Sequence, residues 1–104
     1  MLMGRKRYLM NKHGNSSYII KYLPIVVEEH IPELSSTAKV RIKKAIEERL
    51  TIDPLGFGKP LRYSLKGHRR LRVGDYRVIY RVEPKTHMVL IVAIKLRRDS
   101  YEEI

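Results

Sequence analysis

The feature that most constrains the fold is a β-hairpin signal in the second half of the chain. Residues 68–73 and 76–82 form two alternating runs that are separated only by Gly74 and Asp75. Gly-Asp between alternating runs is typical of a two-residue hairpin turn, so the sequence predicts two adjacent antiparallel strands. The arginines of these strands are Arg69, Arg70, Arg72, Arg77 and Arg81. Because alternate residues of a strand share a face, we expect the arginines of the second strand to lie exposed on a rigid surface that suits phosphates.

The other face of the second hairpin strand is apolar and aromatic. The residues that alternate with its arginines are Tyr76, Val78, Tyr80 and Val82. We interpret the two tyrosines as core residues and not as platforms for stacking bases, because large aromatic side chains dominate the energetics of cores. A further run, 88–94, is apolar on both faces, which predicts a central strand covered on both sides.

The first half of the chain predicts one strand followed by two helices. Residues 17–22 alternate and favour a strand, and residues 24–31 show helical spacing that ends because Pro32 removes a backbone donor. A second helix is expected over 35–50, where a cluster of hydroxyl residues offers an N-cap. We interpret the charges on its outer face as a solvated surface, with a nucleic-acid-binding helix as the alternative.

A turn-rich segment, 51–65, connects the helices to the hairpin. Its prolines and glycines surround Phe57, the single phenylalanine of the chain, which we expect to anchor the segment in the core. The expected order of elements is β-α-α-β-β-β. This order predicts an α+β fold in which two N-terminal helices pack on one face of a small antiparallel sheet.

Length and charge limit the class of protein. The 104 residues suffice for one compact domain and are too few for two. A formal net charge of +11 predicts a polyanionic partner, such as RNA, DNA, an acidic protein or an anionic membrane surface. The sequence contains no cysteine, which excludes disulfides and thiol chemistry. The longest apolar run, 88–94, is too short to span a bilayer, so we expect a cytoplasmic protein without a membrane partner.

The first sixteen residues differ from the rest. They are basic and lack sustained periodicity, so we expect residues 1–16 to form a flexible extension that precedes a single domain of residues 17–104. Later start sites at Met3 or Met10 are an alternative explanation of this segment, and extra nucleic-acid contact is another.

Four segments taken together resemble a known family. In chain order they read GFGKPLR, LKG, RRLRVGDYRVIY and RRDSY, and they resemble the RelE/ParE superfamily of bacterial toxins from type II toxin–antitoxin systems. The resemblance covers residues 17–104 and implies the RelE-like α+β fold. It implies first a metal-independent endoribonuclease that cleaves messenger RNA on the ribosome. The alternatives are a ParE-like poison of DNA gyrase without nuclease activity, and a degenerate toxin that still binds its antitoxin.

The resemblance also implies roles for single residues. Arg77 matches the arginine that contacts the scissile phosphate, and Arg97 or its neighbour Arg98 matches a second catalytic arginine. Tyr101 matches a tyrosine that stacks on a base or orients the nucleophile. The remaining nucleic-acid contacts are implied for Lys66, Arg69, Arg70, Arg72, Arg81 and Arg98.

One departure from the family pattern concerns proton transfer. Many RNA-cleaving relatives carry a histidine just before the C-terminal arginine pair, whereas this chain has Leu96. His68 is the candidate that could supply proton transfer instead, and the alternative is an ordinary surface histidine.

The implied partners are macromolecules. The resemblance implies an acidic antitoxin protein, messenger RNA and the ribosome, with DNA gyrase as the alternative target. It implies no cofactor. We expect no metal site either, because the other histidines fall in the tail, a helix and a turn, where nothing groups them as ligands.

Overall fold

The computed structural model describes residues 17–97 of the chain. The extension expected for residues 1–16 lies outside this range. Arg98 and Tyr101 also lie outside the described residues, so their assigned roles stay predictions.

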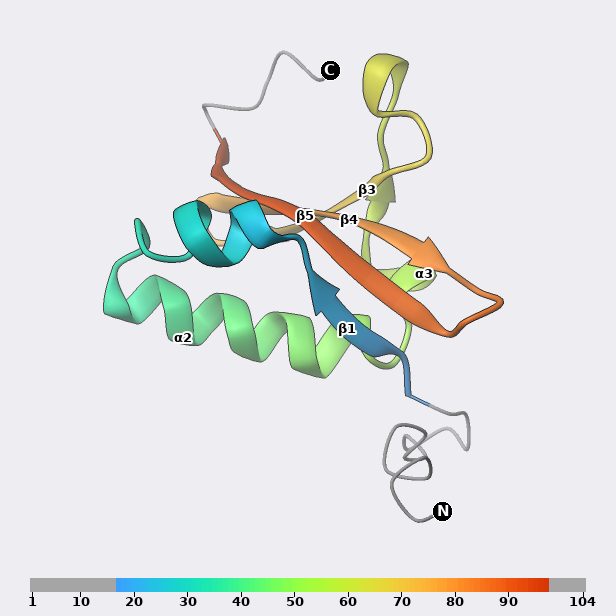
Figure 1. Cartoon of the computed structure of the whole chain (residues 1–104), viewed down its shortest axis with the longest axis horizontal. Helices are drawn as coiled ribbons and strands as arrows, with labels where there is room; N and C mark the ends of the chain where they lie inside the picture. Colours follow the sequence, from blue (N-terminus) through green and yellow to red (C-terminus); the bar gives the residue numbers. More distant parts are fainter. Residues whose placement is uncertain (1–16, 98–104) are drawn as a thin grey trace.

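A five-stranded mixed sheet forms the centre of the molecule (Figure 1). Its strands are β1 (Ile19–Tyr22), β2 (Lys59–Pro60), β3 (Arg69–Val73), β4 (Tyr76–Glu83) and β5 (Met88–Leu96). They lie in the order β1-β5-β4-β3-β2. β1 pairs with β5 in parallel, whereas the other three pairings are antiparallel.

The α+β class is confirmed. The expected fully antiparallel sheet is wrong, and so is the expected order β-α-α-β-β-β, because the chain contains the additional elements η2 (Ile46–Leu50), α3 (Pro54–Phe57), β2 and η3 (Tyr63–Leu65). β1 and β5 are far apart in the sequence, so no hairpin turn fixes their direction, and β1 adds to the edge of β5 in parallel. The two-residue strand β2 was not expected, because proline cannot donate a hydrogen bond to a neighbouring strand. Pro60 is tolerated here because β2 lies at the edge of the sheet. The hairpin itself is confirmed: β3 and β4 meet at Gly74, whose φ of +60° is the left-handed conformation that glycine adopts without strain.

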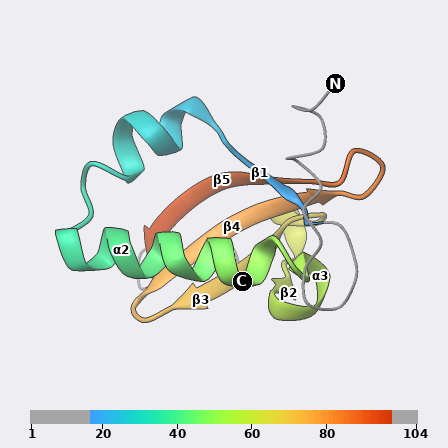
Figure 2. The same cartoon turned by 90° about the horizontal axis from the view of Figure 1, so that it is seen from below.

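Helical segments connect β1 to the hairpin. They are η1 (Val26–His30), α2 (Ser36–Ala45), η2 (Ile46–Leu50), α3 (Pro54–Phe57) and η3 (Tyr63–Leu65). α2 begins where expected, because the Ser35 hydroxyl accepts a hydrogen bond of 3.1 Å from the Ala38 N–H. Figures 1 and 2 show α2 lying across one face of the sheet.

The core lies between this helical layer and the sheet. Ile42, Ile46 and Leu50 project from α2 and η2 into a cluster with buried residues of β3, β4 and β5. Tyr80 of β4 is fully buried in the same cluster, which confirms its interpretation as a core residue. Each fully buried aliphatic side chain stabilises the fold by roughly 1.5–3 kcal/mol relative to an exposed one. This face of the sheet therefore supplies most of the stability.

A β-bulge in β5 changes which residues share a face. Tyr80 pairs with Ile91, but Ile79 pairs with Ala93, so Val92 is the extra residue. A bulge breaks strict alternation, and the expected alternation through residues 88–94 is wrong beyond Ile91 for this reason. As a result Ile94 packs in the core with Ile91.

The turn around α3 is attached to the sheet by polar contacts and not by its phenylalanine. Phe57 is 50% exposed, so the expected aromatic anchor is wrong. Instead the Tyr80 hydroxyl donates a buried hydrogen bond of 2.6 Å to the Pro54 carbonyl. A Cβ atom at Gly58 would collide with that hydroxyl, so the close approach requires glycine here. Burial raises the pKa of Tyr80, which keeps the hydroxyl protonated as a donor.

Candidate nucleic-acid interface

The sheet face away from α2 carries a row of three cations, here called the cation row. Arg72 of β3 lies directly opposite Arg77 of β4, and Arg77 lies directly opposite Lys95 of β5. Directly opposite residues have Cβ atoms about 4.5–5.5 Å apart, so the three side chains share one small area. The bulge in β5 creates this row, because without the shift Arg77 would face Ile94 instead of Lys95.

The cation row opposes folding. Like charges placed directly opposite each other on adjacent strands destabilise a sheet, and here two such pairs are adjacent. Arg77 is also only 8% exposed, so the expectation of an exposed arginine at this position is wrong. Burying a charge costs free energy. A surface of one charge sign attracts counter-ions, so the cation row favours the binding of an anion, which would also offset the repulsion between the cations.

The two outer members of the cation row are available to a ligand. Arg72 and Lys95 are exposed, and neither side chain forms an ion pair with a described carboxylate. Arg81, on the same face, differs because its guanidinium lies 3.1 Å from the Glu83 carboxylate. Arg81 is therefore an ion-pair partner of Glu83, whereas Arg72 and Lys95 have no described carboxylate beside them.

Further cations continue the same face. By strand register, Arg70 lies opposite Ile79 and beside Lys59 of β2, while Lys21 of β1 lies opposite Leu90. Lys95, Lys59 and Lys21 were missed by the sequence analysis. Alternation within β5 pointed to the wrong face for Lys95, and no sequence signal paired β1 or β2 with their neighbours.

Arg69 does not belong to this face. It lies opposite Tyr80, on the helix-covered side, and its guanidinium donates hydrogen bonds of 2.7 Å and 2.8 Å to the carbonyls of Leu55 and Gly58. The expectation that Arg69 lines the same surface as Arg70 and Arg72 is therefore wrong. Its contacts attach the α3 turn to the sheet.

The expected catalytic residues fall at two ends of the β3–β4 hairpin. Arg97 lies at the turn end, where its N–H donates a hydrogen bond of 2.7 Å to the Asp75 carbonyl, close to the cation row in the sheet. His68 lies at the opposite end, just before β3. Arg72 follows it by four positions, which corresponds to about 13 Å along a strand. The structure thus brings Arg97 toward Arg77 but does not bring His68 there.

The loop before β3 adds a basic projection to the same side of the molecule. In Figure 1 this loop, drawn in yellow, rises above the sheet on the side away from α2. A hydrogen bond of 2.9 Å from the Leu61 N–H to the His68 carbonyl closes it. It carries Arg62 and Lys66, both exposed, and Tyr63, which is 74% exposed with a φ of +59°. The sequence analysis missed Tyr63. A tyrosine outside any alternating or helical pattern, between Arg62 and Lys66, could have indicated an exposed aromatic side chain.

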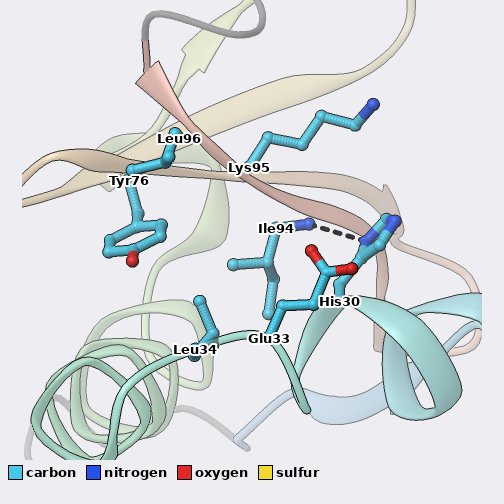
Figure 3. A pocket seen from close by; sticks show the side chains of 7 residues that line it. All are labelled: His30, Glu33, Leu34, Tyr76, Ile94, Lys95 and Leu96. Carbon is cyan, nitrogen blue, oxygen red and sulfur yellow. Dashed lines mark hydrogen bonds between the residues drawn. The ribbon is translucent and has the colours of Figure 1, made fainter.

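A pocket lies at the edge of the sheet beside this face (Figure 3). It measures about 290 Å³ and is lined by His30, Glu33, Leu34, Tyr76, Ile94, Lys95 and Leu96. The Ile94 N–H donates a hydrogen bond of 3.2 Å to His30 Nδ1, which fixes the end of η1 against β5. Figure 3 shows that the Lys95 side chain extends away from the other lining residues. The ammonium of Lys95 is therefore directed toward the open face and not into the pocket.

No group of His, Asp and Glu side chains within residues 17–97 could hold a metal ion. No helix in the same range is long and apolar enough to cross a membrane.

The fold and the charges define a small basic α+β protein with one helix-covered and one cationic sheet face. A family model for the ParE toxin of type II toxin-antitoxin system, parDE, matches residues 19–101. The chain belongs to this family, within the RelE/ParE superfamily of toxins.

Individual relatives agree with this assignment. Toxin RelE of Mycobacterium tuberculosis is 45% identical over 49 residues, which cover 47% of this chain and 50% of the relative. The chain therefore matches half the length of that curated relative. The toxin-antitoxin complex RelBE2 from Mycobacterium tuberculosis contains a chain with a TM-score of 0.72 and 26% identity, over 78% of this chain and 99% of that one. The archaeal RelE-RelB complex from Pyrococcus horikoshii contains a chain with a TM-score of 0.62 and 26% sequence identity. The match covers 78% of this chain and 96% of that one.

Proposed function

We propose that this protein is the toxin of a toxin–antitoxin module and acts as a metal-independent endoribonuclease on messenger RNA at the ribosome. The observation that carries the proposal is the cation row of Arg72, Arg77 and Lys95. Three positive charges on neighbouring strands match the charge that develops on a phosphate during cleavage. The resemblance to RelE proteins supports the choice of RNA as substrate.

The proposed reaction, RNA cleavage without a metal ion, requires positive charge beside the scissile phosphate. In metal-free cleavage the ribose 2′-hydroxyl attacks the adjacent phosphorus, and negative charge accumulates on the phosphorane oxygens. The planar guanidinium of Arg77 can hold two of these oxygens at once, and Arg72 can reach the same phosphate from the neighbouring strand. Both side chains project from paired strands, which limits their movement and keeps them in position for an in-line attack.

Residues near the C-terminus complete the proposed site. The backbone hydrogen bond from Arg97 to Asp75 fixes the chain beside the hairpin turn, and from there the Arg97 side chain can contact the RNA backbone. We propose the same roles as before for Arg98 and Tyr101, which follow Arg97 by one and four positions. Lys66 and Arg70, with Arg62, would bind phosphates on either side of the scissile one.

The proposed inhibitor is an acidic antitoxin. The net charge of +11 would attract cellular RNA indiscriminately unless a partner neutralised it. Solved relatives were crystallised as toxin–antitoxin complexes, which supports a partner of this kind. A partly disordered acidic chain that folds on binding could cover the cation row.

A second candidate function is poisoning of DNA gyrase without nuclease activity. Two observations favour it: the matching family model is that of the ParE toxin, and Leu96 occupies the position where many RNA-cleaving relatives carry a histidine. In this case the cation row would bind an acidic protein surface or DNA.

One expression experiment separates these functions. The full chain is induced in bacteria without an antitoxin, and 5′ ends of transcripts are mapped in the same cells as gyrase–DNA cleavage complexes. We expect new transcript ends inside coding regions, and we expect Arg72→Gln to reduce them while Lys44→Ala, on the exposed face of α2, leaves them unchanged. Growth arrest with intact transcripts and trapped gyrase would contradict the nuclease and support the second candidate. Absence of arrest at high expression would indicate an inactive toxin.

A further inference from the structure

We propose that Lys95 is the general acid that protonates the leaving 5′-oxygen during RNA cleavage. This inference rests on the proposed nuclease function, and it assigns a chemical step to a residue that the sequence analysis missed.

Register places Lys95 where such a group is needed. Lys95 lies directly opposite Arg77, at a Cβ separation of about 4.5–5.5 Å for such a pair. Its side chain extends away from the neighbouring pocket (Figure 3), and no described carboxylate pairs with it. A phosphate held by Arg77 would therefore lie within reach of the Lys95 ammonium.

The neighbouring side chains are poor proton donors. Arg72 and Arg77 keep their protons, because a guanidinium is not deprotonated in proteins. His68 is separated from Arg72 by about 13 Å of strand, too far for a hydrogen bond to the same phosphate. Tyr76 lies opposite Leu96, on the pocket side of the sheet. Among residues 17–97, Lys95 is thus the side chain beside Arg77 that can both reach the phosphate and release a proton.

The step balances as follows. The 2′-oxygen forms a bond to phosphorus and its proton passes to solvent water. The bond between phosphorus and the 5′-oxygen breaks, and its electron pair stays on that oxygen, which takes a proton from the Lys95 ammonium. The products are a 2′,3′-cyclic phosphate and a 5′-hydroxyl end. Lys95, now a neutral amine, regains a proton from water.

A leaving-group substitution tests the assignment directly. The full chain is added to ribosomes programmed with an ordinary messenger RNA, or with one that carries a bridging sulfur in place of the scissile 5′-oxygen. A thiolate leaves without protonation, so it does not need a general acid. The proteins compared are wild type, Lys95→Ala, Lys95→Arg and Lys44→Ala, the last as an exposed lysine on α2, on the opposite side of the sheet.

We expect Lys95→Ala to lower the single-turnover rate on the oxygen substrate by about 100-fold or more, the usual contribution of a general acid. On the sulfur substrate we expect a rate close to that of wild type. Lys95→Arg should remain as slow as Lys95→Ala on oxygen, because arginine keeps the charge but not the transferable proton. Lys44→Ala should cleave both substrates at the wild-type rate.

Three results would overturn the inference. Equal losses on oxygen and sulfur would show that Lys95 only binds the phosphate. Full activity of Lys95→Arg would show that its charge is sufficient. A wild-type rate for Lys95→Ala on oxygen would assign protonation to another group. If wild type itself cleaved neither substrate, the proposed nuclease function would fail first.

Discussion

The two faces of the sheet follow opposite rules. On the helix-covered face, Tyr80 donates a buried hydrogen bond to the Pro54 carbonyl, and Arg69 donates to the carbonyls of Leu55 and Gly58 at the α3 turn. On the open face, Arg72 and Lys95 flank Arg77 with no described carboxylate beside the outer two. The first face pairs the Tyr80 hydroxyl and one guanidinium nitrogen of Arg69 with backbone carbonyls, whereas the second places like charges together. The apolar core thus lies on one face of the sheet and the clustered positive charge on the other.

The largest effect should come from the helix-covered face. Leu50 is fully buried, so Leu50→Ala leaves a cavity and should lower the free energy of unfolding by about 2–5 kcal/mol. Val40→Ala is the matched control, because Val40 on α2 is 67% exposed, and it should change stability by less than about 0.5 kcal/mol. Urea unfolding measures both. A small effect for Leu50→Ala would mean that the helical layer does not form the main core.

A smaller loss is expected at the polar contact beneath the α3 turn. Tyr80→Phe removes the donor to the Pro54 carbonyl and leaves that buried acceptor without it, which should cost about 1–3 kcal/mol. Urea unfolding at neutral pH would measure it. An unchanged unfolding free energy would show that the Tyr80 contact does not hold the turn.

The same substitution should change the response to alkaline pH. The folded state raises the pKa of Tyr80, chiefly through burial, so the unfolded chain loses this proton first as the pH rises. The stability linked to Tyr80 is present below its ordinary pKa of about 10 and is lost as the pH rises above that value. Tyr80→Phe should therefore show a smaller loss between pH 9 and pH 11 than wild type. Tyr22, whose pKa burial also raises, stays in both proteins as an internal reference.

The hairpin, the α+β class and the core role of Tyr80 could be predicted because they depend on local patterns. Gly74 defined the turn, and alternation defined the faces of β3 and β4. The cation row could not be predicted in full. It depends on a bulge at Val92, which brings Lys95 opposite Arg77, and the alternation of apolar residues in β5 gives no sign of it.

Other errors arose from long-range contacts. The parallel pairing of β1 with β5 joins segments from opposite ends of the domain, so no turn residue could indicate it. Phe57 was expected in the core on its hydrophobicity alone, but the buried hydrogen bond from Tyr80 to Pro54 already attaches that turn. The position of Arg69 on the helix-covered face could not be predicted for a similar reason, because the carbonyls that accept its hydrogen bonds belong to residues more than ten positions away.

The most direct test of the division between faces is the stability of Arg72→Gln. This variant removes one like charge opposite Arg77 and keeps a polar, exposed side chain. We expect the free energy of unfolding to rise by about 0.2–1 kcal/mol at low salt, and the gain to shrink at high salt because screening already weakens the repulsion. Arg81→Gln is the control, because Arg81 is paired with Glu83, and it should be neutral or slightly destabilising. A loss of stability in Arg72→Gln equal to that of Arg81→Gln would contradict the account.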